Sequence, residues 1–382
     1  MLDLLAQQAA ARGASDAYIY LADDGPQQQI SYAALEERAQ AIAAQLQRRL
    51  SPGDRALLVY PAGLEFVTAF FGCLYAGVVA VPATYPKPRR PLPRMNRIAI
   101  DCGAHLALTT SQTLDTIDFE QIDPEVGHLD WIATDTIESA AAHDWNEPKV
   151  NPDDLAFLQY TSGSTSDPKG VMVSHGNLLS NLAAIQQAFG IGEVDADHIA
   201  STGVFWLPAY HDMGLIGGVL TPLYVGGRSV LMSPNSFLAR PLRWLEAIHE
   251  FKATISGAPN FAYKLCAQRT TPEERAQLDV RLWRLAFCGA EPIRAATIRN
   301  FTEAFAEAGF RPSSLYPCYG LAESTLLATG PAYGQEPTIT AFDRAALAAH
   351  QATPAGNPSA DQVQAQVGCG AVVAEHELMV VD

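Results

Sequence analysis

Hydrophobic residues alternate between short β-rich runs and longer segments with helical spacing. In the first part of the chain, strand-like runs occupy residues 56–60, 78–82 and 106–110, and helical patterns cover Tyr32–Leu50, a segment from about Leu64, and Pro93–Cys102. Ser31 precedes the first helical pattern and is the expected N-cap. Repeated alternation of strand and helix predicts an α/β fold with a parallel sheet covered by helices.

The alternation resumes after the Asn, Pro and Asp residues at 151–154. The expected strands are 155–160, 171–175, 229–232, 253–256, 285–289 and 314–320, and the expected helices are Asn177–Phe189, 241–250, 259–268 and 294–308. This pattern predicts a second parallel sheet. We therefore expect a first α/β subdomain over 1–150 and a second, carrying a nucleotide site, over 151–340. A surface insertion is expected over 341–366, followed by the start of a smaller, truncated β subdomain over 367–382, which suggests a fragment.

Composition narrows the class of protein. The 382 residues are 48% hydrophobic and 17% charged, which favours a globular enzyme and argues against long disorder. The net charge of −16 argues against nucleic-acid binding, and it also means that any nucleotide site has to be locally positive or rely on Mg²⁺. The six cysteines form no C-x-x-C pair, so we expect buried free thiols and a cytoplasmic location.

One segment is long and uncharged enough to span a bilayer. It covers Phe66–Pro86, but Gly72, Gly77 and Pro82 divide it into a helical part and a short β-rich part. A buried helix followed by a buried strand explains it better, so no membrane span is expected. The first residues carry no early positive charge, and we expect no signal peptide.

The stretch 161–175, TSGSTSDPKGVMVSH, carries the clearest chemistry. Its small residues offer backbone N–H groups and hydroxyls at close range, and Lys169 adds one cation, which is what a polyphosphate needs. It is not a Walker loop, because Lys169 precedes Gly170. A flexible linker is the alternative, but apolar runs flank the loop closely. The candidate donors are Thr161, Ser162, Gly163, Ser164, Thr165 and Lys169.

Further motifs resemble those of the adenylate-forming enzymes. They are WLPAYHDMGLIG at 206–217, GAEP at 289–292 and YGLAES at 319–324. Within that superfamily, the first of these, CYGLAESTLLATG at 318–330 and the late insertion with FDRAAL and VGCG resemble fatty acyl-AMP ligases. The resemblance covers nearly the whole chain and implies ATP-dependent activation of a fatty acid, with transfer to the phosphopantetheine arm of an acyl carrier protein. Polyketide or lipid assembly is the expected setting.

The resemblance also implies parts that this sequence does not contain. The family continues with an Asp that holds the ribose hydroxyls, a hinge, and a smaller C-terminal domain with a catalytic Lys. We therefore expect the chain to correspond to the large N-terminal domain, to need the missing C-terminal domain as a partner, and to be poorly active alone.

The resemblance implies nucleotide roles for residues in two motifs. Glu323 is the candidate Mg²⁺ ligand, since Mg²⁺ prefers one or two carboxylates plus phosphate oxygens; a solvent-facing Glu is the alternative. Tyr319 offers a flat face for adenine, although a core Tyr is the alternative. The remaining candidates around the nucleotide are Gly289, Ala290, Glu291, Gly320 and Ser324.

His211 is the third catalytic candidate, besides Lys169 and Glu323. A His–Asp pair suggests acid–base catalysis or metal binding, but a carboxylate substrate is already ionised at pH 7 and needs no general base. Orientation of the carboxylate or the α-phosphate by a hydrogen bond is the favoured role, and a satisfied core His is the alternative. An apolar acyl pocket is expected around Trp206, Met213, Gly214, Ile216, Phe261 and Tyr263, each of which an ordinary core explains equally well.

Three other functions remain open. The chain could belong to an acyl-CoA synthetase, an amino-acid adenylation domain, or a non-catalytic nucleotide or lipid binder. The insertion argues weakly against an acyl-CoA synthetase. No clearly placed Asp supports an amino-acid adenylation domain, although Asp212 could be suggested. The basic segment Lys87–Arg97 has five positive charges in eleven residues, and is either a solvated loop or a docking patch for an acidic carrier protein or for phosphates.

Overall fold

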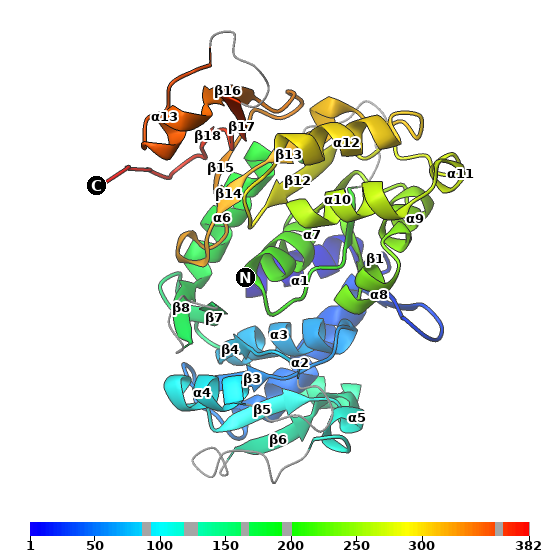
Figure 1. The fold of residues 1–382 in the computed structure, drawn as a ribbon. Coiled ribbons are helices and arrows are strands. Elements are labelled where there is room, and N and C mark those ends of the chain that lie inside the picture. Colours follow the sequence, from blue (N-terminus) through cyan, green and yellow to red (C-terminus); the bar gives the residue numbers. More distant parts are fainter. Residues whose placement is uncertain (86–92, 118–128, 162–167, 193–200, 356–361, 382) are drawn as a thin grey trace. The chain divides into compact units, whose positions relative to one another are not determined.

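The computed structural model describes residues 1–85, 93–117, 129–161, 168–192, 201–355 and 362–381. The chain divides into two compact units, Met1–Ala183 with Trp206–Pro234, and Ala184–Phe205 with Asn235–Asp382. Figure 1 traces the elements of both. This division differs from the four-part organisation expected from the sequence, which stays a prediction.

The first unit contains a sheet in the order β6-β5-β3-β4-β7-β8. Its neighbours pair in parallel except for β7 and β8, which are antiparallel. The sequence assigned β7 and β8 to a second sheet; that assignment is wrong, because Phe157 of β7 pairs with Ala80 of β4. The strands are β3 (Arg55–Leu58), β4 (Val79–Pro82), β5 (Leu106–Thr109), β6 (Asp130–Ala133), β7 (Leu155–Thr161) and β8 (Lys169–Ser174).

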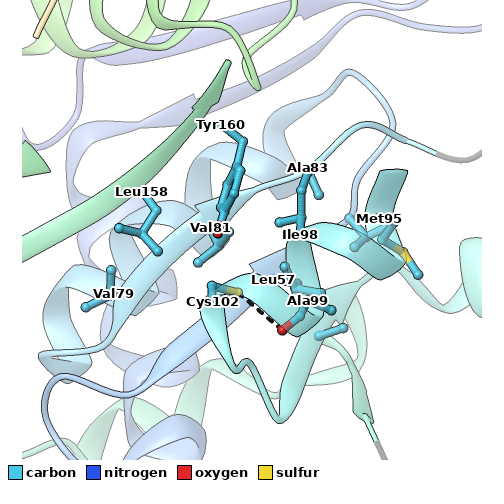
Figure 2. Packing of buried hydrophobic residues seen from close by; sticks show 12 residues of the cluster. Leu57, Val79, Val81, Ala83, Met95, Ile98, Ala99, Cys102, Leu158 and Tyr160 are labelled. Atoms are coloured by element: carbon cyan, nitrogen blue, oxygen red, sulfur yellow. Dashed lines mark hydrogen bonds between the residues drawn. The ribbon is translucent and has the colours of Figure 1, made fainter. Parts of the chain in front are cut away.

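Helices cover both faces of this sheet, as the α/β pattern predicts. Figure 2 shows α4 packed against one face, where Ile98 and Cys102 join a buried cluster that includes Leu57, Val81 and Tyr160. On the opposite face, Phe70 of α3 makes an edge contact with Phe157, their ring centroids 5.9 Å apart. The helices of this part are α1 (Leu2–Arg12), α2 (Tyr32–Gln47), α3 (Leu64–Ala76), α4 (Pro93–Cys102), α5 (Ser111–Leu114), η3 (Thr134–Thr136) and η4 (Ser139–Asp144).

Two local signals in this unit act as expected. The Ser31 hydroxyl accepts a hydrogen bond from the Ala34 N–H at 3.2 Å and caps α2. Gly77 ends α3 with φ 71°, a left-handed conformation that favours glycine. The uncharged segment therefore folds as a buried helix followed by the buried strand β4. In the described part of the chain, no helix has both the length and the hydrophobicity needed to cross a membrane.

The first unit also contains the elements β1 (Asp16–Leu21), β2 (Gln28–Ser31), β10 (Arg228–Met232), η5 (Met213–Leu220) and α7 (Thr221–Tyr224). Strand β1 pairs in parallel with β10 and antiparallel with β2. Helix α6 (His175–Ala188) begins directly where β8 ends.

The second unit contains parallel strands in the order β13-β12-β11-β9. They are β9 (Thr202–Phe205), β11 (Ile255–Pro259), β12 (Leu285–Gly289) and β13 (Leu315–Pro317). An aromatic core packs beside them, with Trp244, Tyr263 and Trp283 in mutual ring contact. The helices of this part of the chain are α8 (Pro234–Ala239), α9 (Leu242–Glu250), α10 (Asn260–Arg269), α11 (Pro272–Arg275), α12 (Ala295–Phe305) and η6 (Pro312–Ser314).

Small antiparallel sheets follow the parallel strands, so the predicted fold class is confirmed. One has the order β14-β15-β18, built from β14 (Tyr319–Gly320), β15 (Leu327–Gly330) and β18 (Ala371–Val372). The single strand expected over 314–320 is therefore wrong, because the chain changes sheets at Cys318. The expected insertion overlaps the antiparallel pair β16 (Ile339–Asp343) and β17 (Val363–Val367), and α13 (Arg344–Ala348) lies between these strands in the sequence.

His175 makes the stability of the first unit depend on pH. Its side chain is 4% exposed, its Nδ1 atom has no hydrogen-bond partner in the described part of the chain, and burial lowers its pKa to about 4. His175 is therefore protonated near pH 6.5 in the unfolded chain but only near pH 4 in the folded chain.

As the pH drops from 6.5 to about 4, we expect the free energy of unfolding to fall by up to about 1.4 kcal/mol per pH unit because of this group. Denaturant titrations at several pH values measure the slope. His175→Gln should flatten it, whereas the same change at the exposed His143 should not. Equal slopes for His175→Gln and the wild type would contradict the assignment.

Candidate functional site

The two ends of the predicted phosphate loop are held together by strand pairing. Thr161 is the last residue of β7 and Lys169 the first of β8, and the two are cross-strand partners. Lys169 is exposed, so its ammonium group is available to an anion. Ser162, Gly163, Ser164 and Thr165 lie outside the described residues. The described part of the loop thus consists of Thr161 at one end and Pro168, Lys169 and Gly170 at the other.

Tyr160 lies on β7 directly before Thr161. It pairs with Gly170, and a Cβ atom on Gly170 would lie only 2.9 Å from the Tyr160 ring. The Tyr160 hydroxyl donates a hydrogen bond to the Asp101 carboxylate of α4, and burial together with this bond raises the Tyr160 pKa. The ring therefore links the root of the loop to a neighbouring helix, with glycine leaving the space that the ring occupies.

His211 and Asp212 lie at the start of a π-helix, η5. The His211 Nδ1 and Asp212 Oδ1 atoms are 2.7 Å apart, and the same Oδ1 accepts a hydrogen bond from the Met213 N–H at 2.6 Å. The bond to Asp212 raises the His211 pKa above its ordinary value of 6.5, against the opposing effect of burial. The His211 side chain remains 52% exposed. With the proton on Nδ1, the imidazolium form can donate from Nε2 to an anion.

Met213, Gly214 and Ile216 are buried within η5, and Trp206 is buried just before it. Gly214 is required there, because a Cβ atom would lie 2.2 Å from the Pro208 carbonyl oxygen. π-Helices are rare and often mark functional segments. The structure therefore brings these predicted acyl-pocket residues together with His211 on one segment.

A hydrogen bond also connects this segment to strand β7, which ends at Thr161. The Gln159 Nε2 group of β7 donates a hydrogen bond to the Tyr210 carbonyl at 2.8 Å. Sequence reasoning missed Gln159 and Asp101. The one available signal was a Gln in an otherwise apolar strand, next to the glycine–hydroxyl stretch.

Several predicted site residues of the second unit, three for the nucleotide and Phe261 for the acyl pocket, follow adjacent parallel strands. Phe261 follows β11, Gly289 and Glu291 lie at the end of β12, and Tyr319 follows β13. The Glu291 carboxylate accepts a hydrogen bond from the Phe261 N–H at 2.6 Å, and a Cβ atom on Gly289 would lie 3.1 Å from the Cys318 carbonyl oxygen. These segments meet at the carboxyl edge of the sheet, where open α/β folds bind ligands.

Unusual backbone geometry accompanies these segments. Ala290 has φ 64° and Thr325 has φ 68°, both in the left-handed region that favours glycine. Such conformations often mark functional sites. At Gly320, a Cβ atom would lie 2.0 Å from the Leu326 carbonyl oxygen, so the turn that presents Tyr319 tolerates no larger residue. Tyr319 is 49% exposed, which leaves a ring face accessible.

Glu323 and Ser324 lie in η7 (Ala322–Ser324), and the Glu323 side chain is exposed. In the described part of the chain, no group of three or more His, Cys, Asp or Glu side chains could hold a metal ion. A single exposed carboxylate nevertheless fits Mg²⁺, which keeps waters and takes its other ligands from nucleotide phosphates. Glu323 can therefore supply one ligand but not a complete protein site.

Tyr263 has a different environment from the other predicted acyl-pocket residues. It is fully buried, donates its hydroxyl to the Phe287 carbonyl at 2.8 Å, and packs among the aromatic core. Core packing accounts for it, which was the alternative kept open for every residue of that group. Phe261, two residues earlier, is 40% exposed.

A groove of about 1100 Å³ lies between α12 and the β16–β17 pair, and none of the predicted site residues lines it.

Comparison with known proteins identifies the family. The profile of AMP-binding enzymes matches residues 5–382. The chain belongs to the AMP-binding enzyme family.

Relatives within this family confirm the resemblance to fatty acyl-AMP ligases. The chain is 41% identical to the medium-chain-fatty-acid–[acyl-carrier-protein] ligase JamA of Moorena producens, over 100% of this chain and 65% of that protein. It is 38% identical to the long-chain-fatty-acid–AMP ligase FadD26 of Mycobacterium bovis, over 92% of this chain and 61% of that protein. The chain thus spans less than two thirds of the length of these relatives.

A solved structure gives the same assignment. The fatty acyl-adenylate ligase from L. pneumophila, in complex with acyl adenylate and pyrophosphate, matches with a TM-score of 0.89 and 39% identity. The match covers 97% of this chain and 63% of that one. This AMP-binding enzyme therefore shares both fold and sequence with a fatty acyl-adenylate ligase.

The contact between Gly170 and Tyr160 can be tested directly. Gly170→Ala should lower the free energy of unfolding by about 1–3 kcal/mol, because the new Cβ displaces the ring. Denaturant unfolding measures the loss. Gly368→Ala is the matched control, since its Cβ would meet only ordinary contacts. In a Tyr160→Leu background the cost of Gly170→Ala should shrink; strict additivity would show that the ring is not the obstacle.

Proposed function

We propose that the protein containing this chain activates a fatty acid with ATP and Mg²⁺ to an acyl-adenylate, and transfers the acyl group to the phosphopantetheine thiol of an acyl carrier protein. The observation that carries the proposal is the match to the ligase solved with acyl adenylate and pyrophosphate. The names of relatives such as JamA support the carrier-protein acceptor. The transfer step and the C-terminal domain expected to assist it belong to the proposal for the whole protein.

In the proposed first step, a carboxylate oxygen attacks the α-phosphorus of ATP. A bond from that oxygen to phosphorus forms, the bond to the pyrophosphate oxygen breaks, and pyrophosphate leaves with the electron pair. Two anions have to approach each other, so charge neutralisation and alignment supply most of the catalysis. Mg²⁺, when bound, would neutralise phosphate charge, and Glu323 is the side chain proposed to hold it.

The residues of the first unit fit the charge problem. Lys169 and the loop after Thr161 would hold the β- and γ-phosphates, as hydroxyls, N–H groups and one cation do at other anion sites. His211 would donate a hydrogen bond to the carboxylate or the α-phosphate, and its raised pKa favours the imidazolium form that does this best. No general base is needed, because the substrate carboxylate is ionised at neutral pH.

The residues of the second unit suit the nucleoside. The Tyr319 ring would stack on adenine, with Gly289, Ala290, Glu291, Gly320 and Ser324 around it. The buried residues Trp206, Met213, Gly214 and Ile216 are the proposed start of the acyl pocket. Relatives named for medium-chain and for long-chain fatty acids both match, so the proposal assigns the substrate class and leaves the chain length open.

Calorimetry with Mg²⁺ tests the adenylation part. We expect the folded chain to bind a dodecanoyl-adenylate mimic with a sulfamoyl linkage more tightly than it binds adenosine, because the acyl and phosphate subsites then contribute as well. A phenylalanyl-adenylate mimic is the matched comparison, and should bind more weakly than the fatty acyl one. Equal affinity for adenosine and both mimics would refute the proposed function.

Lys169→Ala separates the triphosphate contact from the rest. Loss of one charge-assisted hydrogen bond should weaken ATP binding by about 10- to 100-fold. Binding of the adenylate mimic, which lacks β- and γ-phosphates, should change little. Lys149→Ala removes the same charge at another exposed position and controls for net charge. A large loss of thermal stability in Lys169→Ala would contradict its placement as an exposed loop residue.

A further inference from the structure

Gln159 is a buried polar side chain in the strand that leads into the phosphate loop. It lies two residues before Thr161 on β7 and is 3% exposed. Side chains alternate between the faces of a strand. Leu158 and Tyr160 join the cluster on the α4 side, as Figure 2 shows, and Phe157 contacts Phe70 on the other side. Gln159 therefore shares the face of Phe157.

Packing alone does not explain an amide at this position. Burial of an amide without hydrogen bonds costs free energy, and Leu or Met would fill a similar volume without that cost. The Gln159 Nε2 group donates to the Tyr210 carbonyl at 2.8 Å, and a carbonyl can only accept, so the orientation of the amide is determined. Its Oε1 atom is buried with no hydrogen-bond partner in the described part of the chain. The bond to Tyr210 is therefore the contact that accounts for a Gln at this position.

Tyr210 directly precedes His211, and the segment is tied at its other side to η5. The His211 carbonyl accepts hydrogen bonds from the Gly214 and Leu215 N–H groups at 3.0 and 2.9 Å. The His211 N–H donates to the Pro208 carbonyl at 3.0 Å. These bonds set the shape of the turn, whereas the Gln159 bond attaches the turn to β7.

We propose that Gln159 is a positioning residue that holds the Tyr210–His211 turn against β7, and so fixes the His211 ring relative to the root of the phosphate loop. Its catalytic consequence rests on the function proposed above. The same strand ends at Thr161, whose partner is Lys169. One side chain thus sets the distance between the group expected at the α-phosphate and the groups expected at the β- and γ-phosphates.

The first test needs no ligand. Gln159→Met keeps the size of the side chain and removes the amide, and NMR of histidine-labelled protein follows the His211 ring, assigned with His211→Ala. We expect the ring resonances to shift and the titration midpoint to move toward 6.5, as the Nδ1–Asp212 bond loosens. Asp212→Asn gives the reference for a lost bond. Leu158→Met, on the same strand but the opposite face, should leave the His211 signals unchanged.

A second variant guards against failure to fold. Gln159→Asn keeps the amide but is one methylene shorter, so it should lose the bond to Tyr210 and give the same spectral change. Unchanged His211 signals in a folded Gln159→Met or Gln159→Asn protein would overturn the proposal. Misfolding of both variants with normal folding of Leu158→Met would also overturn it, since Gln159 would then be a residue of the core.

A double-mutant cycle measures the functional consequence. Gln159→Met should weaken binding of the dodecanoyl-adenylate mimic by about tenfold, and it should add nothing further in a His211→Ala background. Adenosine binding should be unaffected by either change. Additive losses would show that Gln159 does not act through His211. If the wild type bound no mimic, the proposed function would fail, while the titration would still decide whether Gln159 positions the ring.

Discussion

The antiparallel pairing of β7 with β8 is the constraint on which the first unit depends. It places Thr161 opposite Lys169, and it puts the Tyr160 ring in the space that Gly170 leaves open. Bringing two distant positions of a chain together costs conformational entropy. The pairing of Thr161 with Lys169 offsets that cost within the sheet itself. On one face of β7, Tyr160 bonds to Asp101 of α4. On the other face, Gln159 bonds to the turn before η5.

The sequence predicted the elements better than their partners. Apolar runs located β3, β4, β5, β7 and β12 to within a few residues, because a buried parallel strand needs a continuous apolar stretch. The same runs do not show which strand pairs with which, so β7 and β8 were assigned to the wrong sheet. The run MGLIGGVL is equally apolar on all sides and gives no helical period, which is why the π-helix was not expected.

The candidate site followed the same division. Lys169, His211, Tyr319 and Glu323 were chosen because they lie in short motifs of characteristic chemistry, and their roles stay predictions. Asp101 and Gln159 could not be predicted, because their partners are distant in the sequence. Asp101 bonds to Tyr160, 59 positions away, and Gln159 bonds to Tyr210, 51 positions away. Tyr263 shows the converse: a residue near a motif can be part of an aromatic core, and composition cannot separate the two.

The net charge of −16 restricts where on the chain a nucleotide can be attracted. With −16 overall, the chain repels free nucleotide at long range, so attraction has to arise within a Debye length of the binding groups. Lys169 contributes one basic side chain at the loop. Asp212 raises the His211 pKa through their hydrogen bond and so favours the imidazolium form, and the carboxylate balances the charge of that form. An imidazolium paired in this way retains a donor for an incoming anion without adding net charge. The His–Asp pair therefore suits the proposed site, in which a carboxylate and a phosphate would come together, more than a site that has to accept a proton.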